Sequence, residues 1–368
     1  MTTKYRVVGI NFDHFHMGDL LRMAKDHPQV ELVGVYDEQP KRVHPVLSGL
    51  ELPPTLLWED CERMLDATQP DIVVLCPAAA KHAQWVERVA RKGQLLLIEK
   101  PFAGSLTEAR RMMAIAEQRD CQLAINWPLA WVATHRTAYE YANYQHAIGE
   151  LVGVNYYGGN RGPLWHTFDK IEMTAEEVAA NKPTSWFYQK ASGGGSLLDY
   201  LGYGATLGSW YLKNRQPLEV TTVVDQPAGL EVDEHSITVC RYAFGLSRME
   251  TRWGTFTDPW NNPTIPPTGY TLFGTEGVIQ SSDYATCIRM QNREHPDGID
   301  VASLAKYDAS LPREHREACN PIEYVVDCLD RKVAIDGPLG MAINLTGQRL
   351  IDTAMLSSQQ KRTVPLLD

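Results

Sequence analysis

The sequence predicts an α/β protein of two domains, in which a doubly wound parallel sheet is followed by an α+β domain with an open, mostly antiparallel sheet. Three observations predict it. The chain has 368 residues, more than one hydrophobic core usually holds. In the first third, short apolar runs alternate with segments of helical spacing. In the second half, strand patterns separated by turn signals dominate.

The first domain is expected to contain buried strands joined by helices. Helical spacing is seen at 19–25 and 81–91, and a further helix begins after Ser105, a capping residue with Glu108 three positions later. We expect the domain to end near Asn126, so residues 1–126 and 127–368 form the two domains. The apolar runs that predict its strands are 5–10, 30–36, 71–76, 94–98 and 122–126.

The start of the chain resembles a dinucleotide site. Asp37 ends the second strand, where a carboxylate accepts hydrogen bonds from the adenosine ribose and disfavours a 2′-phosphate, so we expect NAD rather than NADP. The glycine fingerprint is incomplete, because Gly9 is followed by Asn11 and His14 at the positions of the next two glycines. We therefore expect the backbone to approach the pyrophosphate less closely.

The segment His14-Phe15-His16 does not predict a metal site. Its two histidines alternate, and no third ligand stands near them in the sequence. We interpret them as phosphate-loop or structural histidines, and no metal is expected.

The segment Glu99-Lys100-Pro101 follows the apolar run 94–98, the most continuous of the predicted strands. Open α/β sheets bind ligands at the carboxyl ends of their strands, and proline forces the backbone to turn there. On these residues alone, an ordinary strand end is the better explanation. Their context favours a site that carries a carboxylate and an amine.

The second domain shows strand patterns with few helices between them. The loop 258–269 is rich in proline and asparagine and could reach a neighbouring subunit. Helices are expected at 320–329 and 339–358, closing this domain. The strands are expected at 220–224, 236–244, 246–253, 270–274 and 277–281.

Composition excludes several classes of function. A net charge of -10 and a pI near 5.6 give no basic surface for nucleic acid. No apolar run reaches the roughly 20 residues of a membrane span. The seven cysteines include no Cys-x-x-Cys pair, which favours reduced thiols and a cytoplasmic protein. The expected partner is a small molecule.

Motifs along most of the chain resemble the glucose-fructose oxidoreductase, inositol dehydrogenase and MocA (Gfo/Idh/MocA) family, whose first domain is an NAD-binding Rossmann fold. The resemblance is carried by Gly9, Asp37, Glu99-Lys100-Pro101, the glycine-rich helix start from Ser192 to Asp199, and the late turn from Gly274 to Gly277. It implies an oxidoreductase in which Lys100 and Asp199 lie beside the nicotinamide and the reacting carbon. It also implies that the bare face of the second sheet pairs subunits into a homodimer or homotetramer.

Tyr203 stands one helical turn after Asp199, where the family usually has histidine. Oxidising a secondary alcohol requires a proton acceptor while hydride leaves for the nicotinamide. We expect Tyr203 to be the general acid-base, with Lys100 lowering its pKa and Asp199 orienting the group. The alternative is a structural tyrosine packed among other aromatic side chains.

Further side chains are candidates for the two ligand sites. Aromatic faces and hydrogen-bonding groups of the middle region are suited to a sugar. The cofactor candidates are Gly9, Asn11, Phe12, His14, Asp37, Pro77, His82, Glu99, Lys100 and Asn126. The substrate candidates are Lys100, Trp127, Arg161, Trp165, His166, Trp186, Tyr188, Asp199 and Tyr203.

The leading interpretation is an NAD(H)-dependent oxidoreductase that acts on a secondary alcohol of a sugar, polyol or sugar derivative. Two other classes stay open. One is a lyase or glycoside hydrolase that oxidises its substrate transiently and releases no NADH. The other is a non-catalytic NAD-binding sensor, which the incomplete fingerprint allows and the set Lys100, Asp199 and Tyr203 argues against.

Overall fold

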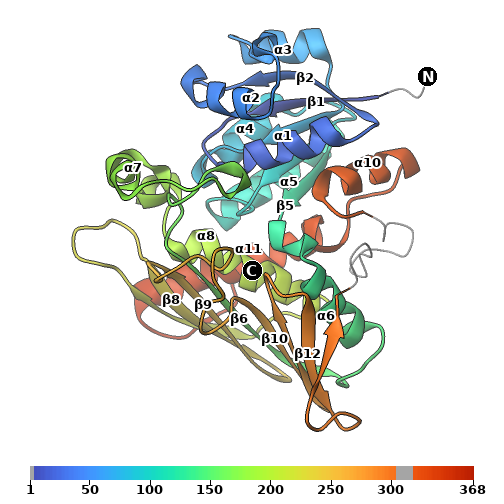
Figure 1. Cartoon of the computed structure of the whole chain (residues 1–368), viewed down its shortest axis with the longest axis vertical. Helices are drawn as coiled ribbons and strands as arrows, with labels where there is room; N and C mark the ends of the chain where they lie inside the picture. Colours follow the sequence, from blue (N-terminus) through green and yellow to red (C-terminus); the bar gives the residue numbers. More distant parts are fainter. Residues whose placement is uncertain (1–3, 304–317) are drawn as a thin grey trace.

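The computed structural model describes residues 4–303 and 318–368 and contains two sheets, one above the other in Figure 1. The upper sheet is the expected parallel sheet, with helices on both faces. The lower sheet is broad and mostly antiparallel, with helices on one face. The expected fold class is therefore confirmed.

The first sheet has five parallel strands in the order β2-β1-β3-β4-β5. Because both faces are covered, its strands are apolar and almost wholly buried. Alternate side chains divide between two cores, one under α1, α2 and α10, the other under α3, α4 and α5. The strands are β1 Tyr5–Ile10, β2 Val30–Tyr36, β3 Ile72–Leu75, β4 Leu95–Glu99 and β5 Gln122–Asn126.

The helices of this half follow the expected alternation. The Ser105 hydroxyl accepts the amide hydrogen of Glu108 at 3.3 Å and caps α5, as the sequence predicts. The helices are α1 His16–Asp26, α2 His44–Gly49, α3 Cys61–Thr68, α4 His82–Val89 and α5 Leu106–Arg119.

The second sheet has nine strands in the order β13-β12-β11-β10-β6-β9-β8-β7-β14. Within this sheet, β6 and β9 are the only described strands that pair in parallel. The expected segments are confirmed as β7 Glu219–Asp225, β8 His235–Tyr242, β9 Gly245–Trp253, β10 Gly269–Gly274 and β11 Gly277–Ser282. Strands that the sequence patterns missed are β6 Leu151–Asn160, β12 Cys287–Asn292, β13 Ile299–Ala302 and β14 Val364–Pro365.

The central strand β6 was missed because its glycines weaken the strand pattern. They are required by close packing: a Cβ on Gly153 would lie 2.3 Å from the carbonyl oxygen of Leu246. Helices α6, α8, α9 and α11 cover one face of the sheet. The remaining helices are α6 Ala133–Asn143, α7 Ala175–Asn181, α8 Ser196–Gly202, α9 Gly208–Tyr211, α10 Pro321–Arg331 and α11 Met341–Gln360.

The sequence suggested that the helix at 320–329 closes the second domain. In the structure this helix, α10, does not do so. It lies beside α1 and buries Ile322, Tyr324 and Val325 in the core under the first sheet (Figure 1). The apolar face of α10 fits either sheet equally well, so local pattern could not decide between them.

The loop 258–269 lies at this chain's own cavity through Trp260, whereas Ile265 further along it is fully exposed. Within the described ranges, no helix combines the length and apolarity that crossing a membrane requires.

Candidate active site

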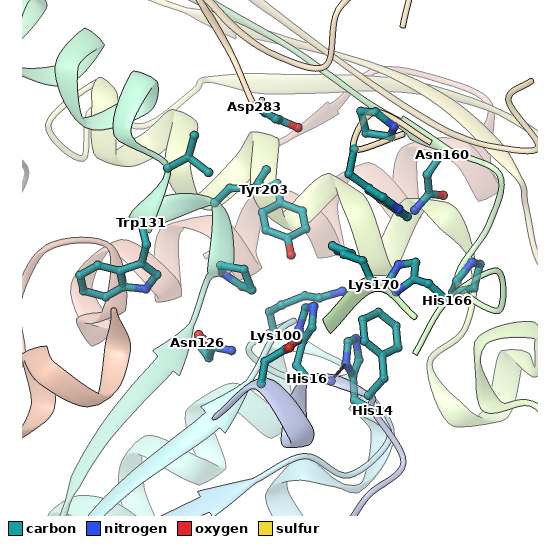
Figure 2. A pocket seen from close by; sticks show the side chains of 18 of the residues that line it. His14, His16, Lys100, Asn126, Trp131, Asn160, His166, Lys170, Tyr203 and Asp283 are labelled. Carbon is teal, nitrogen blue, oxygen red and sulfur yellow. Dashed lines mark hydrogen bonds between the residues drawn. The ribbon is translucent and has the colours of Figure 1, made fainter. Parts of the chain in front are cut away.

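A cavity of about 480 Å³ lies between the two sheets, in the volume range typical of small-molecule sites. Its walls come from the start of α1, the ends of β4, β5 and β6, helix α8 and the start of α10. Figure 2 shows Lys100, Tyr203, Asn126 and His166 around this space. Both domains therefore contribute to one site.

A buried ion pair joins the domains at this cavity. Lys100, directly after β4, donates from Nζ to Asp199 Oδ1 on α8 at 2.5 Å, and the side chains are 3% and 2% exposed. Gly195 precedes α8 with φ 108°, a conformation that favours glycine, and a Cβ there would lie 2.7 Å from Asp233 Oδ1. The glycine-rich segment thus presents Asp199 to Lys100.

Tyr203 follows on the same helical segment, and its hydroxyl points into the cavity (Figure 2). Lys100 Nζ lies 5.5 Å from the centroid of its ring. Burial raises the pKa of Tyr203 well above its usual value, and the carboxylates of Glu99 and Asp199 add to the effect. The pKa of Tyr203 is thus raised, where a lowering by Lys100 was expected, because desolvation dominates; the Lys100 ammonium faces the ring and bonds to Asp199.

Glu99 is fully buried and is held by two neighbours. Its Oε1 lies 2.7 Å from His16 Nδ1, and its Oε2 accepts from Asn126 Nδ2 at 2.8 Å. His14 Nε2 is 3.9 Å from the same Oε1. The fold thus supplies the third possible metal ligand that the sequence lacked beside the histidines, since ligand atoms of His14, His16 and Glu99 lie within 4.8 Å of one another.

The hydrogen bonding of His14 argues against coordination. The amide of His16 donates to His14 Nδ1 at 3.2 Å, so the neutral ring carries its proton on Nε2. Burial lowers the pKa of His14 well below its usual value and keeps the ring neutral. His14 Nε2 is therefore a buried donor, and it has no hydrogen-bond partner within the described chain.

The turn between β1 and α1 holds the expected nucleotide residues. Asn11 adopts a left-handed conformation, φ 66°, where the fingerprint has glycine. Asp37 accepts the amide of Phe12 at 2.6 Å and that of Gln39 at 2.6 Å, and burial raises its pKa. Asp37 thus stands at the end of β2 as predicted, with its carboxylate joined to the turn.

Asp13, in the same turn, carries a negative charge that sequence analysis overlooked. Its carboxylate pairs with Arg42 and accepts the amide of Ala78 at 3.1 Å. Its carbonyl oxygen accepts from the indole N–H of Trp186 at 3.0 Å. Trp186 was expected at the substrate, and the structure hydrogen-bonds it to the nucleotide turn and stacks it on Phe187.

Three of the cofactor candidates have structural roles. His82 is buried, with its ring nitrogens each 3.1 Å from the carbonyl oxygens of Phe102 and Pro77. The carbonyl oxygen of Pro77 is therefore occupied by the His82 ring. Gly9 provides room for α1, since a Cβ there would meet Met17 Sδ at 3.0 Å. Both ring nitrogens of His82 thus already have partners within the chain.

Most of the substrate candidates also lie away from the cavity. Trp127 is fully buried and donates to Asn344 Oδ1 at 2.7 Å. Arg161 pairs with Asp258 and stacks on Trp165, and Tyr188 packs on Trp253. Their roles are structural.

His166 is the substrate candidate from the middle region that does line the cavity. Burial and the neighbouring Lys170 lower the pKa of His166 to about 3, so the ring stays neutral.

The structure brings in several side chains that sequence reasoning missed. Asn160 at the end of β6 donates to the Tyr200 hydroxyl at 2.7 Å, and Asp283 after β11 lies 2.9 Å from His135 Nε2. Asn160 and Asp283 are polar residues at or just after the end of a strand, which is a position typical of functional side chains. This pattern could have indicated both residues if β6 and the end of β11 had been predicted. The other missed residues that line the cavity include Tyr156, Trp131, Trp260, Tyr284, Phe187 and Lys170.

The residues of the β1–α1 turn fit a dinucleotide. Asn11 Oδ1 and His14 Nε2 are buried and without partners among the described residues, and hydroxyl or phosphate oxygens would satisfy groups of this kind. Asp13 is the opposing feature, because its charge lies in the turn that holds phosphates in such folds.

Comparison with known proteins agrees with this geometry. Residues 3–127 match the model of the Gfo/Idh/MocA oxidoreductase family, described by its NAD-binding Rossmann fold. The match spans the expected first domain, so the resemblance seen in the motifs is confirmed there, together with NAD as the cofactor class of the fold.

Individual relatives and solved structures extend the comparison. D-apiose dehydrogenase of Paraburkholderia graminis is 30% identical over 111 residues, which is 30% of this chain and only 29% of that protein. Aldose-aldose oxidoreductase from Caulobacter crescentus has the same fold over 100% of both chains, with a TM-score of 0.75 and 18% identity. Levoglucosan dehydrogenase, solved with NADH and levoglucosan, covers 100% of both chains with a TM-score of 0.74 and 14% identity.

Proposed function

We propose that this chain is an NAD(H)-dependent oxidoreductase of carbohydrates, on the premise that its residues 3–127 match the model of the Gfo/Idh/MocA oxidoreductase family. The reaction is hydride transfer between the nicotinamide and a secondary alcohol carbon of a sugar, polyol or sugar derivative. The observation that carries the proposal is the meeting of Lys100, Asp199 and Tyr203 at one interdomain cavity. An amine from one domain and a phenol from the other face the same space.

The proton chemistry follows from the state of each side chain. Because Tyr203 stays protonated, its phenol donates a hydrogen bond and does not act as a resting base. Lys100 donates one hydrogen bond to Asp199 and has others for a substrate oxygen. In carbonyl reduction both groups polarise the oxygen, and Lys100 gives the proton. In alcohol oxidation Lys100 must first be present as the neutral amine; it then takes the hydroxyl proton and becomes the ammonium that pairs with Asp199.

The nicotinamide supplies the hydride chemistry when it is bound. The residues that would hold the dinucleotide are Asn11, His14 and Asp37, with Asn126 and Lys100 toward its reacting end. Asp37 favours NAD over NADP, because a carboxylate at the end of β2 repels a 2′-phosphate.

The cavity favours a carbohydrate-like substrate. Tyr200, Trp260 and Tyr284 provide aromatic walls, and Asn160 and Asp283 provide polar groups beside them. The names of the relatives, an apiose dehydrogenase and an aldose-aldose oxidoreductase, agree with this class. Aromatic faces with a few placed polar groups are the usual form of such sites.

The test is NADH formation by the purified chain with a panel of sugars, inositols, polyols and sugar acids. Lys100→Met should lower kcat/KM by roughly 10²- to 10⁴-fold. Lys92→Met, which changes an exposed lysine, should leave it unchanged. Folding is checked with Lys100→Met/Asp199→Leu, because the single change leaves a buried carboxylate unpaired and costs about 3–5 kcal/mol.

Substrate conversion without NADH release would instead favour transient oxidation, as in a lyase or glycoside hydrolase. NAD binding without conversion of any compound would favour a sensor.

We also propose that the chain forms a homo-oligomer through the open face of the second sheet. That face exposes Val223, Ile237, Val239 and Leu246 from β7, β8 and β9. A sheet face that lacks a helical cover and exposes apolar side chains is suited to pairing with a second copy. A monomeric mass in solution would contradict this.

A further inference from the structure

Lys170 enters the cavity from a tight turn, the 3₁₀ segment Phe168–Lys170. Asp169 and Lys170 both adopt left-handed conformations, φ 54° and 57°. Two consecutive residues of this kind are unfavourable for side chains other than glycine and persist only where surrounding structure imposes them. The turn therefore holds Lys170 at an enforced position.

Contacts with α1 impose this conformation. Arg22 pairs with Asp169 at 2.7 Å, and the amide of Asp169 donates to Asp19 Oδ1 at 3.0 Å. Phe168 packs on Gly18, where a Cβ would lie 2.5 Å from its ring. Both carboxylates beside Lys170 are thus used to anchor the turn to α1.

Of the cations that line the cavity within the described residues, Lys170 is the one without an ion-pair partner. Lys100 is neutralised by Asp199, and Asp283 is engaged by His135. Within residues 4–303 and 318–368, Lys170 has no carboxylate at ion-pair distance, and its ammonium lies over the Trp260 ring at 4.2 Å. His14 and His166 are neutral. Asp19, Asp258 and Asp283 favour its charged form from a distance, and an ammonium without a direct ion-pair partner is free to bind an anion.

The setting of Lys170 supports ligand contact. Its side chain is exposed to solvent, and the surrounding protein atoms lower its pKa through desolvation. A bound anion would restore the charged form. Figure 2 shows Lys170 and Lys100 both near the middle of the view, with Tyr203 beside them. One end of a substrate could meet Lys170 while the other lies at the reacting groups.

We propose that the substrate is a polyhydroxy carboxylate, a sugar acid, whose carboxylate binds Lys170 while its reacting carbon lies at Lys100 and Tyr203. A single ammonium matches a monoanion. A phosphate would call for more donors, and Arg22, the nearby guanidinium, is already paired with Asp169. This identification rests on the proposed function for the reaction, whereas the carboxylate contact stands on the charges of the cavity.

The experiment compares D-gluconate and D-glucuronate with the neutral D-glucitol and D-glucose, on wild type, Lys170→Met, Lys170→Arg and the exposed control Lys92→Met. Binding is measured by calorimetry with and without NAD, and turnover by NADH formation. Wild type should bind or turn over at least one acid roughly 10- to 100-fold better than its neutral counterpart. Lys170→Met should abolish the preference, Lys170→Arg should retain part of it, and Lys92→Met should leave it intact.

Each outcome decides one question. Equal or better binding of the neutral compounds by wild type overturns the carboxylate proposal, and so does an equal loss for acids and neutral compounds in Lys170→Met. Acid binding that depends on Lys170 without NADH formation supports the anion site and counts against the proposed function instead. An unchanged melting temperature of Lys170→Met confirms that the comparison concerns folded protein.

Discussion

The β1–α1 turn and the interdomain cavity lie next to each other, and they differ in whether their charged side chains have partners within the chain. In the turn, the Asp13 carboxylate is satisfied by Arg42 and the amide of Ala78. In the cavity, the Lys170 ammonium has no described carboxylate partner, and the Tyr203 hydroxyl faces open space. The turn thus balances its charge within the chain, whereas the cavity leaves donors and a positive charge for a ligand.

This difference separates two kinds of anion binding. A dinucleotide phosphate must compete with Asp13 for the turn, because the carboxylate lies where these folds bind phosphate. An anion in the cavity meets the Lys170 ammonium, which has no described ion-pair partner, while the nearby Asp283 carboxylate lies at His135. Substitutions that change the charge in the turn and in the cavity should therefore have different effects on ligand binding.

The largest effect is expected at Tyr203. Tyr203→Phe removes a proton donor at the cavity and should lower kcat by about 10²-fold or more, with NAD affinity unchanged. Because the pKa of Tyr203 is raised, the rate of wild type should show no ionisation of this residue below pH about 10. Steady-state kinetics and NAD titration check this. Tyr157→Phe, away from the cavity, is the control, and parental turnover by Tyr203→Phe would remove the assigned role.

A smaller effect is expected at Asp13. Asp13→Asn removes a negative charge from the turn and releases Arg42, so NAD should bind about tenfold more tightly. Titration of NAD followed by protein fluorescence measures it, with Asp26→Asn at the exposed end of α1 as the control. Weaker binding in Asp13→Asn would mean that Asp13 organises the turn and does not compete with phosphate.

The smallest effect concerns pH and stability. His166 has a pKa of about 3 in the folded protein, below its value near 6.5 in the unfolded chain. The unfolded chain therefore binds its proton first as the pH falls, and the stabilisation present above pH 6.5 is lost on acidification. Between pH 7 and 5.5 this histidine should cost roughly 1 kcal/mol of unfolding free energy.

Urea denaturation of wild type and His166→Gln at both pH values measures the histidine's share. The variant should lose less stability on acidification than wild type. An equal loss in both proteins would show that His166 is not held neutral by the cavity wall.

How much could be predicted from sequence differs between the halves. The parallel strands, Asp37 at the end of β2 and Lys100 after β4 follow from local apolar runs and from the residues that end them. The candidate site was predicted less completely. Trp127, Arg161 and Trp165 have suitable chemistry for a sugar, but packing directs them elsewhere. Glu99 and His16 are 83 residues apart in the sequence, and the pairing of the strands brings them into contact.

The sequence by itself determined the alternation of strands and helices and the family motifs, because each depends on residues close together in the chain. Tertiary structure alone decided that β6 pairs with β9, that α10 covers the first sheet, and that Lys170 enters the cavity. It also decided the protonation of Tyr203, since desolvation depends on every atom packed around the phenol. Such contacts join residues far apart in sequence, and no local pattern encodes them.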